Sequence, residues 1–420
     1  MGKNVRRLIV LFLSGMVYHS AYPQKPYTTS VYPDRVVLNP TAQAATSIAV
    51  SWRTSLETEK GWVELGIAEA GPDLTQKLSR VEAKREVHQL QDGRTLAYYS
   101  AVMQNLQPGE LYIYRAGDGK HWSEWYQFNT MKNEDKLSFV FFGDAQNDLR
   151  SRWSRVVRQA YAEHPGADFY LHAGDLVNTG ANDQEWGEFF EAASFTMASI
   201  PQVMTPGNHE YKGKEWGLCP QWQAQFALPL NGPDGLKEVC YYVDYPQARV
   251  ISLDAEQIDE SEHWRDEQKN WLEKVLAENE KAWTVITFHY PIYSTKPNRD
   301  NEKLRMHFKP LFDKYKVDLV LQGHDHGYAR GMKKIPDNHG QTMYVVSVSG
   351  PKMYEVQSAP WMDRKAGNTQ LFQVIEIEGN RLQYQAFTAD RVLYDAFEII
   401  KKKGKKILKN KIPEHVPERL

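Results

Sequence analysis

Residues 317–328 read VDLVLQGHDHGY, an apolar run followed at once by Gly323, His324, Asp325 and His326. A short apolar run that stops at a glycine is typical of a buried strand ending in a tight turn. Imidazole nitrogens are common metal ligands, and two histidines follow this strand directly. The stretch therefore predicts an α/β fold in which a buried strand carries metal-binding side chains at its carboxyl end.

Four other stretches repeat this arrangement, each an apolar run with a metal-competent side chain after it. They are residues 137–142 (LSFVFF) before Gly143 and Asp144, 168–173 (DFYLHA) before Gly174 and Asp175, 201–206 (PQVMTP) before Gly207, Asn208, His209 and Glu210, and 283–288 (WTVITF) before His289. Ligands in α/β sheets collect outside the carboxyl ends of the strands, so these side chains are expected to converge. Carboxylate, amide oxygen and imidazole together suit metals such as zinc, manganese and iron. Any one of these side chains alone has an ordinary structural explanation, whereas five in order favour a metal site.

The five segments resemble the ordered motifs of calcineurin-like metallophosphoesterases, which are GD, GD, GNH[DE], H and GHxH. The strand-rich residues 33–52, 105–112 and 122–130 resemble the fibronectin-like domain that precedes the catalytic domain of purple acid phosphatases. Altogether the resemblance covers about residues 33–395. It implies a fibronectin type III-like β-sandwich followed by an α/β metallophosphoesterase domain with four layers in the order α/β/β/α.

Carried over residue by residue, the resemblance implies a centre of two divalent metal ions, with Mn, Zn, Fe and Mg as the candidates. Asp144 and His326 would bind the first metal, Asn208, His289 and His324 the second, and Asp175 would bridge them. A hydroxide on the metals would attack phosphorus, because metal binding lowers the pKa of water. His209 would protonate the leaving group or stabilise its charge, with Glu210 or Asp254 as its orienting partner. Asn208 and His209 would also contact the substrate.

Two positions depart from the resembled families. Purple acid phosphatases carry a tyrosine three places after the bridging aspartate, where this chain has Asn178. Many other members have a histidine two places after the first aspartate, where this chain has Gln146. We expect Gln146 to supply an amide oxygen to the first metal, with Asn178 or water as the substitute ligand. Neutral oxygen in place of phenolate favours divalent ions over ferric iron, so the protein should not be purple.

The loop of residues 295–302 (TKPNRDNE) has no histidine, although purple acid phosphatases place one there near the phosphate. Lys296 or Arg299 could replace it, because both are permanent donors to phosphate oxygens near neutral pH. An exposed charged loop without a role in binding is the alternative.

The chain of 420 residues is long enough for two or three domains. Short alternating segments separated by turns predict the β-sandwich over residues 33–131, and alternating strands and helices predict the catalytic domain over residues 137–398. The basic residues 399–420 are expected to be a solvated or frayed terminus, with binding of an anionic polymer as the alternative.

The first 21 residues predict a secretory signal peptide, hence a secreted or periplasmic protein. Positive residues precede an apolar run at residues 8–18 that is too short to span a membrane, and small residues follow. A buried N-terminal helix is the alternative. In an exported chain, Cys219 and Cys240 could form a disulfide. Their spacing does not resemble a zinc site.

The predicted activity is hydrolysis of phosphate monoesters, with a small phosphate ester as the partner. A phosphodiesterase acting on nucleotides or glycerophosphodiesters is one alternative. A metal-binding surface protein without catalysis is another, although metal binding alone does not require His209. The formal net charge of −2 gives no signal for nucleic-acid binding, and no later stretch is long enough for a membrane span. The sequence leaves the oligomeric state open.

Overall fold

Two four-stranded antiparallel sheets form the N-terminal domain of the computed structural model, which describes residues 27–74, 77–132, 134–211 and 217–420. One sheet has the order β1-β2-β6-β5 and the other β4-β3-β7-β8. The strands are β1 (Asp34–Pro40), β2 (Ile48–Thr54), β3 (Trp62–Ile67), β4 (Ser79–Glu82), β5 (Lys84–Gln89), β6 (Thr95–Met103), β7 (Leu111–Gly117) and β8 (Tyr126–Asn129). Their inward residues share one core, in which Trp52 stacks on Tyr99 with ring centroids 5.3 Å apart. The predicted N-terminal β-sandwich is confirmed. Its assignment as fibronectin type III stays a prediction, and the predicted signal peptide lies outside the described residues.

Two seven-stranded mixed sheets form the second domain. The first has the order β11-β10-β9-β19-β20-β21-β22 and the second β12-β13-β14-β15-β17-β16-β18. Their bounds are β9 (Lys136–Phe142), β10 (Phe169–Ala173), β11 (Gln202–Thr205), β12 (Tyr241–Asp244), β13 (Ala248–Ser252), β14 (Trp283–Thr287), β15 (Leu319–Gln322), β16 (Tyr328–Gly331), β17 (Met343–Val346), β18 (Arg364–Ala366), β19 (Leu371–Glu378), β20 (Arg381–Thr388), β21 (Leu393–Lys402) and β22 (Lys405–Asn410). Strands β9, β10 and β11 are parallel, as are β13, β14, β15 and β17. These parallel strands are the apolar runs of the sequence, because both of their faces are buried.

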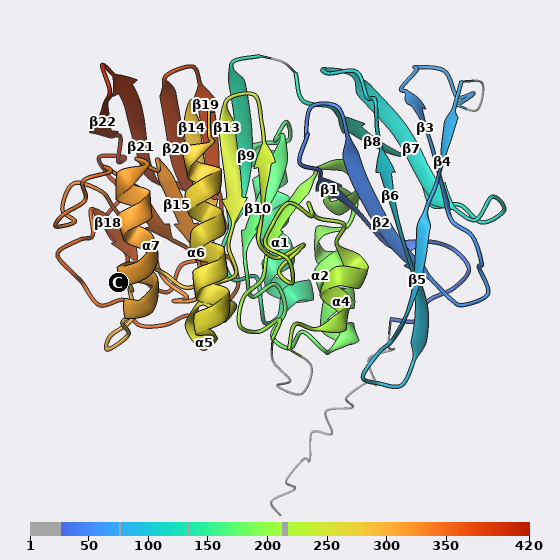
Figure 1. Cartoon of the computed structure of the whole chain (residues 1–420), viewed down its shortest axis with the longest axis horizontal. Helices are drawn as coiled ribbons and strands as arrows, with labels where there is room; N and C mark the ends of the chain where they lie inside the picture. Colours follow the sequence, from blue (N-terminus) through green and yellow to red (C-terminus); the bar gives the residue numbers. More distant parts are fainter. Residues whose placement is uncertain (1–26, 75–76, 133, 212–216) are drawn as a thin grey trace, which may run out of the picture.

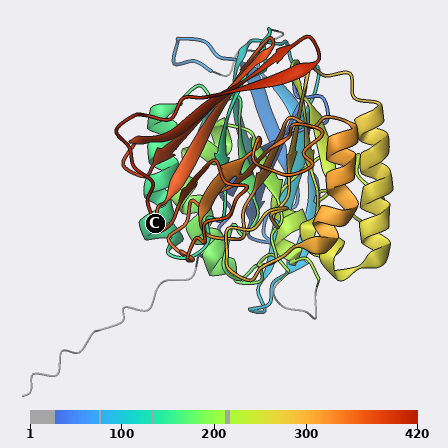
Figure 2. The same ribbon diagram turned by 90° about the vertical axis from the view of Figure 1, so that its left-hand side faces the viewer.

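Helices cover the outer faces of the paired sheets, which gives the predicted α/β/β/α order. They are the π-helical turn η1 (Leu149–Trp153), α1 (Ser154–Glu163), α2 (Asp183–Ala193), α3 (Phe195–Ser199), α4 (Pro220–Gln225), α5 (Ala255–Glu260), α6 (Glu262–Ala277) and α7 (Glu302–Lys314). In Figure 1 the yellow α6 and the orange α7 lie in front of the strands. Figure 2 shows these yellow and orange helices on one side of the molecule and green helices on the other, with strands between.

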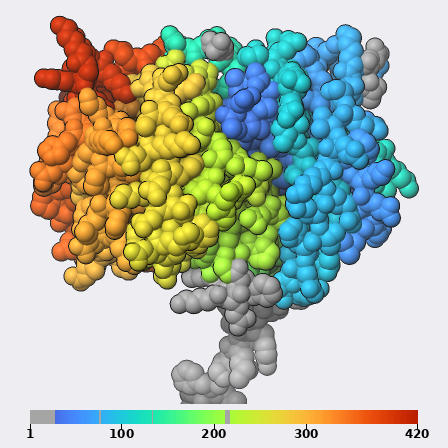
Figure 3. All heavy atoms as spheres, viewed as in Figure 1, coloured from blue at the N-terminus to red at the C-terminus, as the bar shows by residue number. Residues whose placement is uncertain are grey.

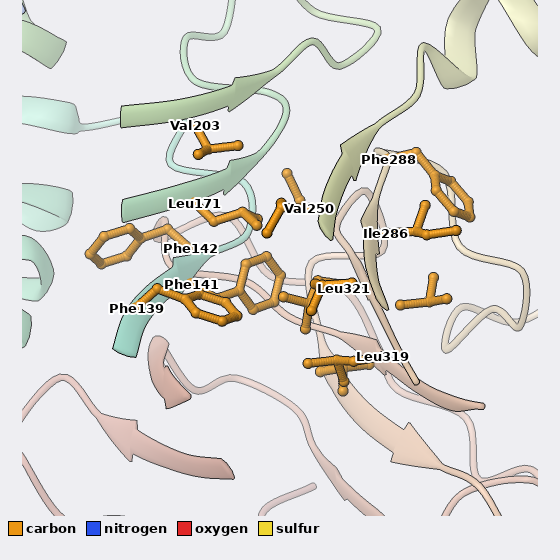
Figure 4. Close-up of a cluster of buried hydrophobic side chains, with 14 of the residues drawn as sticks. Phe139, Phe141, Phe142, Leu171, Val203, Val250, Ile286, Phe288, Leu319 and Leu321 are labelled. Atoms are coloured by element: carbon orange, nitrogen blue, oxygen red, sulfur yellow. The ribbon is translucent and has the colours of Figure 1, made fainter. Parts of the chain in front are cut away.

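The main core lies between the two sheets and is built from alternate residues of the parallel strands. Figure 4 shows Leu171 of β10 and Val250 of β13 meeting there, with Phe141 and Leu321 close by. All four side chains are at most 1% exposed. The burial of these chains fixes how the two sheets face each other, and so where the carboxyl ends of their strands lie.

The C-terminal residues are part of the first sheet, so the expectation of a frayed tail and a domain boundary at residue 398 is wrong. Strand β21 runs to Lys402 and pairs with β22, which forms the dark red edge in Figure 1. Lys403 and Gly404 have φ angles of 51° and 75°, as a two-residue hairpin turn requires. The hairpin is held because Asp318 accepts ion pairs from Lys401 at 2.7 Å and Lys406 at 3.0 Å.

The proposed disulfide is absent, because Cys219 and Cys240 are both buried free thiols. They pack against different parts of the fold. The Cβ of Cys219 faces the backbone of Gly180, whereas the carbonyl of Cys240 lies against Gly232. Burial raises the pKa of both thiols.

The two domains meet along a polar and apolar interface. Helix α3 packs against β1 and β8, and α4 against β2, β5 and β6. In Figure 3 the blue N-terminal domain lies directly against the green segment of the second domain. In the described part of the chain, no helix is long and apolar enough to cross a membrane.

Candidate metal centre

The predicted ligands lie just beyond the carboxyl ends of five parallel strands, and both sheets contribute. Asp144, Asp175 and Asn208 follow β9, β10 and β11 of the first sheet, while His289 and His324 follow β14 and β15 of the second. The paired sheets bring these ends together, as the position of ligands in α/β folds leads one to expect.

Four of the predicted ligands have left-handed backbone conformations, which residues other than glycine rarely adopt. The φ angles are 25° at Asp144, 52° at Asp175, 72° at His324 and 46° at His326. Such strain costs free energy and typically persists where the surrounding fold holds a functional group in place.

Glycines next to these residues allow the turns to approach one another. A Cβ on Gly207 would lie 2.3 Å from Oδ1 of Asp175, and one on Gly323 would lie 2.4 Å from Oδ2 of Asp144. Any larger residue would therefore displace a carboxylate of the site.

The side chains form two groups of three that share one residue. Asp175, His289 and His324 make one group, and Asp144, Asp175 and His326 make the other, with the ligand atoms of each group within 4.8 Å of one another. His289 Nε2 lies 3.2 Å from Asp175 Oδ2, and His326 Nε2 lies 3.6 Å from Asp144 Oδ1. A carboxylate shared between two sets of ligands is the arrangement expected for a bridging residue.

Three buried oxygen atoms around these groups lack a hydrogen-bond partner among the described residues. They are Asp144 Oδ1, Gln146 Oε1 and Asn208 Oδ1. A buried acceptor without a partner is costly, and a cation would satisfy all three. The donor set of carboxylate, amide oxygen and imidazole therefore fits a pair of divalent cations.

Backbone carbonyls orient two of the histidines. His289 donates from Nδ1 to the carbonyl of Ala173 at 2.7 Å, and His326 donates from Nδ1 to the carbonyl of Lys352 at 2.8 Å. Each ring therefore presents Nε2 to the acidic residues, which is how metal-bound histidines are commonly held.

Charged side chains of the site change one another's pKa values. Burial favours the neutral form of Asp175, but the nearby charge of His289 and the hydrogen bond to it hold the pKa of that carboxyl below its usual range. Burial lowers the pKa of His289, whereas Asp175 and Asp144 raise it, and the net result is about 10. A metal ion therefore has to displace a proton from His289, so metal affinity should rise with pH.

His209 lies beside the two groups and is oriented by a residue that the sequence did not indicate for this purpose. It donates from Nδ1 to the carbonyl of Asn178 at 2.6 Å, and its Nε2 lies 3.7 Å from Asp175 Oδ2. The Asn178 side chain instead lies 3.4 Å from Thr179 Oγ1. The backbone carbonyl of Asn178 thus faces the site, and its side chain as a ligand of the first metal stays a prediction.

Glu210 and Asp254 do not orient His209, so both assignments are corrected. Glu210 is fully buried, and its carboxylate accepts the backbone N–H groups of Asp175 (3.0 Å), Leu176 (2.9 Å) and Gly207 (2.7 Å). It therefore ties the turn after β10 to the turn after β11. Asp254 caps α5 and accepts the hydroxyl of Tyr211.

Gln146 lies beside the first ligand group, and its role as a metal ligand stays a prediction. It is fully buried, and its Nε2 donates to Asp175 Oδ2 at 2.5 Å while Oε1 has no partner. Its amide thus belongs to the group formed by Asp144, Asp175 and His326.

The two predicted substrate-binding cations behave differently. Arg299 donates to the buried carboxylate of Asp325 at 2.6 Å, so its charge is compensated within the protein. Lys296 instead places Nζ 4.5 Å from the ring centroid of Tyr354. Tyr354 and Lys352 lie next to His326, and neither belongs to a metal-binding motif by which it could have been predicted. The sequence signal for the ion pair between Arg299 and Asp325 was Asp325 itself, the acidic residue inside the GHDH motif.

Comparisons with known proteins agree with this arrangement. Residues 137–328 match the calcineurin-like phosphoesterase family, and residues 33–130 match the N-terminal domain of purple acid phosphatases. Acid phosphatase type 7 of Mus musculus is 29% identical over 261 residues, which span 56% of this chain and 57% of the mouse protein. A protein of Arabidopsis thaliana named probable inactive purple acid phosphatase 1 is 24% identical over 296 residues, which span 60% of this chain and 47% of that protein.

The fold is similar to that of a purple acid phosphatase from seeds of yellow lupin (Lupinus luteus). The two structures superpose with a TM-score of 0.74 at 20% sequence identity, over 89% of this chain and 75% of the lupin chain. This likeness extends through both domains.

Proposed function

The chain belongs to the calcineurin-like phosphoesterases and carries the N-terminal domain of purple acid phosphatases, and we propose that it hydrolyses phosphate monoesters at a dinuclear metal centre. The observation that carries the proposal is the pair of ligand groups that share Asp175. The three unpaired oxygens around them support it, since two cations would give each a partner. When bound, two divalent ions supply Lewis acidity towards phosphoryl oxygens and lower the pKa of water.

Asp144, Gln146 and His326 would hold one ion, Asn208, His289 and His324 the other, and Asp175 both. His209 acts on the leaving group. Its Nδ1 donates to the carbonyl of Asn178, and its Nε2 lies on the side of Asp175. A protonated Nε2 gives its proton to the leaving oxygen or stabilises the charge that develops there. Glu210 maintains this geometry by holding the turns that carry Asp175 and Asn208.

We propose monoesters rather than diesters as substrates because the mouse relative is named an acid phosphatase. The competing proposal is a metal-binding protein without catalysis. The name of the Arabidopsis relative, a probable inactive purple acid phosphatase, supports it. The position of His209 argues against that proposal. A hydrogen bond to the carbonyl of Asn178 orients this histidine next to the candidate ligands, although metal binding does not need it. We also propose export of the protein, on the basis of the predicted signal peptide.

The test compares p-nitrophenyl phosphate with bis(p-nitrophenyl) phosphate as substrates of purified protein reloaded with Mn, Zn or Fe. The monoester should turn over faster, and removal of the metals by a chelator should abolish the activity. Faster turnover of the diester would move the function to a phosphodiesterase at the same centre. No turnover of either ester with any metal would contradict the proposed function.

A further inference from the structure

The C-terminal hairpin of β21 and β22 exposes one face of the first sheet. Cross-strand pairing places Lys402 opposite Lys405 and Ile400 opposite Ile407. Opposed residues lie on the same side of a sheet, and side chains alternate along a strand, so these four share the outer face. Leu408, between Ile407 and the next residue of that face, points into the core and is 5% exposed.

The outer face of the hairpin carries an excess of positive charge. We call it the basic face, and its residues are Ile400, Lys402, Lys405, Ile407 and Lys409, with the exposed Lys403 and Lys411 on either side of β22. Among the described residues, none of these five lysines forms an ion pair. Glu398, the carboxylate opposite Lys409, is already paired with Arg381. Residues 401–411 contain no acidic residue, although the whole chain has a formal net charge of −2.

The inner side of the hairpin fixes where the basic face lies on the molecule. Lys401 and Lys406 bind Asp318, which directly precedes β15, at 2.7 Å and 3.0 Å. Lys401 Nζ also lies 4.2 Å from the ring centroid of Trp283, the first residue of β14. The hairpin turn is therefore at the amino ends of the parallel strands, whereas the candidate metal centre is at their carboxyl ends. A partner on the basic face would not cover the metal centre.

No helix shields this part of the sheet. Helix α1 packs on β19, but in the part of the chain that the structure describes no helix packs extensively on β21 or β22. Figure 2 shows the red strands at the top of the molecule with the helices to either side, and in Figure 3 dark red side chains project from this corner. Edge strands often carry lysines that block pairing with another chain. That role does not account for Lys402 and Lys403, which precede the edge strand, or for Ile407, which is 41% exposed on it.

A bilayer that contains anionic lipids fits both kinds of side chain. Lysines near such a surface are attracted to its headgroups, and an apolar side chain between them is buried at the boundary of headgroups and acyl chains. A soluble polyanion would pair with the lysines but leave Ile400 and Ile407 in water. We propose that the basic face binds the protein peripherally to a membrane surface with anionic lipids, while the metal centre stays at the opposite end of the strands. This proposal does not depend on the reaction proposed above.

The test measures co-sedimentation of the whole chain with vesicles of phosphatidylcholine that contain about 30% phosphatidylglycerol, and with vesicles of phosphatidylcholine alone, at about 0.1 M salt. The protein should bind the anionic vesicles and not the neutral ones. The triple variant Lys402→Gln, Lys405→Gln, Lys409→Gln should bind the anionic vesicles at least about tenfold more weakly, because each lysine near the surface adds to the affinity.

A matched control removes the same charge elsewhere. The triple variant Lys60→Gln, Lys120→Gln, Lys274→Gln changes exposed lysines far along the chain from the hairpin and should weaken binding less than about threefold. An equal loss in both triple variants would overturn the proposal, because net charge rather than the basic face would then govern binding. Absence of binding to anionic vesicles, or equal binding to neutral ones, would overturn it as well.

The variant Ile407→Ser separates a bilayer from a soluble polyanion. It keeps every charge, yet it should bind anionic vesicles about threefold or more weakly, because an apolar side chain no longer enters the lipid. Its binding to dextran sulfate should equal that of the unaltered protein. Unchanged binding to the vesicles would overturn the membrane proposal in favour of a polyanion. The side chain is exposed, so an unchanged denaturation midpoint is expected and verifies that the variant folds.

Discussion

At the scale of single residues, the site depends on side chains held by backbone groups rather than by other side chains. His209, His289 and His326 each donate from Nδ1 to a carbonyl. Glu210 in turn accepts several backbone N–H groups. A backbone carbonyl cannot be removed by a side-chain substitution elsewhere in the chain.

The first prediction concerns His209. Replacing it by alanine should lower kcat for p-nitrophenyl phosphate by about 100- to 10,000-fold, because general acid catalysis contributes that much. Bound metal should stay the same, since His209 belongs to neither ligand group. Steady-state kinetics with elemental analysis of the protein checks both. His415→Ala, at an exposed position, is the control. Unchanged activity would show that this histidine takes no part in the reaction.

The convergence of the candidate ligands could be predicted from sequence because each follows an apolar run, and ligands in α/β folds collect at the carboxyl ends of strands. The partners could not. Whether Glu210 points at His209 or at the turn after β10 depends on the left-handed backbone at Asp175, which the sequence does not encode in any short pattern. Asn178 was assigned through its side chain, whereas its backbone carbonyl faces the site.

At the scale of elements, β10 carries a titratable group in its interior. His172 is buried against Phe142 and lies 3.0 Å from Gln202 Oε1, as expected for a hydrogen-bonded core histidine. Burial lowers its pKa to about 4. The unfolded chain takes up this proton below about pH 6.5, whereas the folded chain does so only near pH 4. Stability is therefore lost as pH falls through this window.

The second prediction follows from that difference. The free energy of unfolding of metal-free protein should fall between pH 7 and pH 4.5 by about 2 kcal/mol more than that of His172→Phe. The variant starts from a lower value at pH 7, because Gln202 loses a partner. Urea titrations at several pH values measure both slopes. Parallel slopes would mean that His172 is already charged in the folded protein.

The third prediction concerns the C-terminal hairpin. A chain that ends after Glu398 loses the buried Ile399 and Leu408 and leaves the buried Asp318 without its lysines. We expect a loss of about 5 kcal/mol or more, seen as a lower midpoint in urea or as insoluble protein. A chain that ends after Lys411 keeps the hairpin and should lose much less. Equal stability of both chains would show that β22 is dispensable.

The C-terminal hairpin contains more buried residues than its charge composition indicates. The seven lysines of residues 401–411 look like a solvated segment, yet residues 394–397 and Ile399 of β21 are buried, and the Lys403-Gly404 pair forms a hairpin turn. Lys401 and Lys406 reach Asp318 from the sheet edge, a contact between residues about 80 positions apart. Charge composition alone gives no information on such a partner.

At the scale of the whole molecule, one aspartate connects the two domains. Asp183, the first residue of α2, pairs with Arg35 at 2.7 Å, Arg53 at 3.0 Å and Arg94 at 2.8 Å, all from the N-terminal domain. Asp183, Arg35 and Arg53 have side chains at most 4% exposed. The sandwich is thereby fixed next to the helices of the first sheet. The sequence predicted both domains but contained no sign of this contact, because its members are more than 80 positions apart.

The fourth prediction is that Asp183→Asn destabilises the protein by about 3–5 kcal/mol, because the buried guanidinium of Arg35 loses its counter-charge and that of Arg53 keeps only Asp34. Asp92→Asn removes only an exposed partner of Arg94 and should cost less than about 1 kcal/mol. Denaturation midpoints of the two variants make the comparison. A loss as small for Asp183→Asn as for the control would mean that the domains are held mainly by apolar contacts.

The most direct test of the account is the number of metal ions per chain, measured together with turnover of p-nitrophenyl phosphate, in the unaltered protein and in Asp175→Asn. The unaltered protein should hold two divalent ions. The variant keeps the shape of the side chain but loses the shared carboxylate, so it should hold fewer than one ion and lose about 1,000-fold or more in kcat. A variant that keeps two ions and its activity would contradict the shared role of Asp175, and with it the central claim.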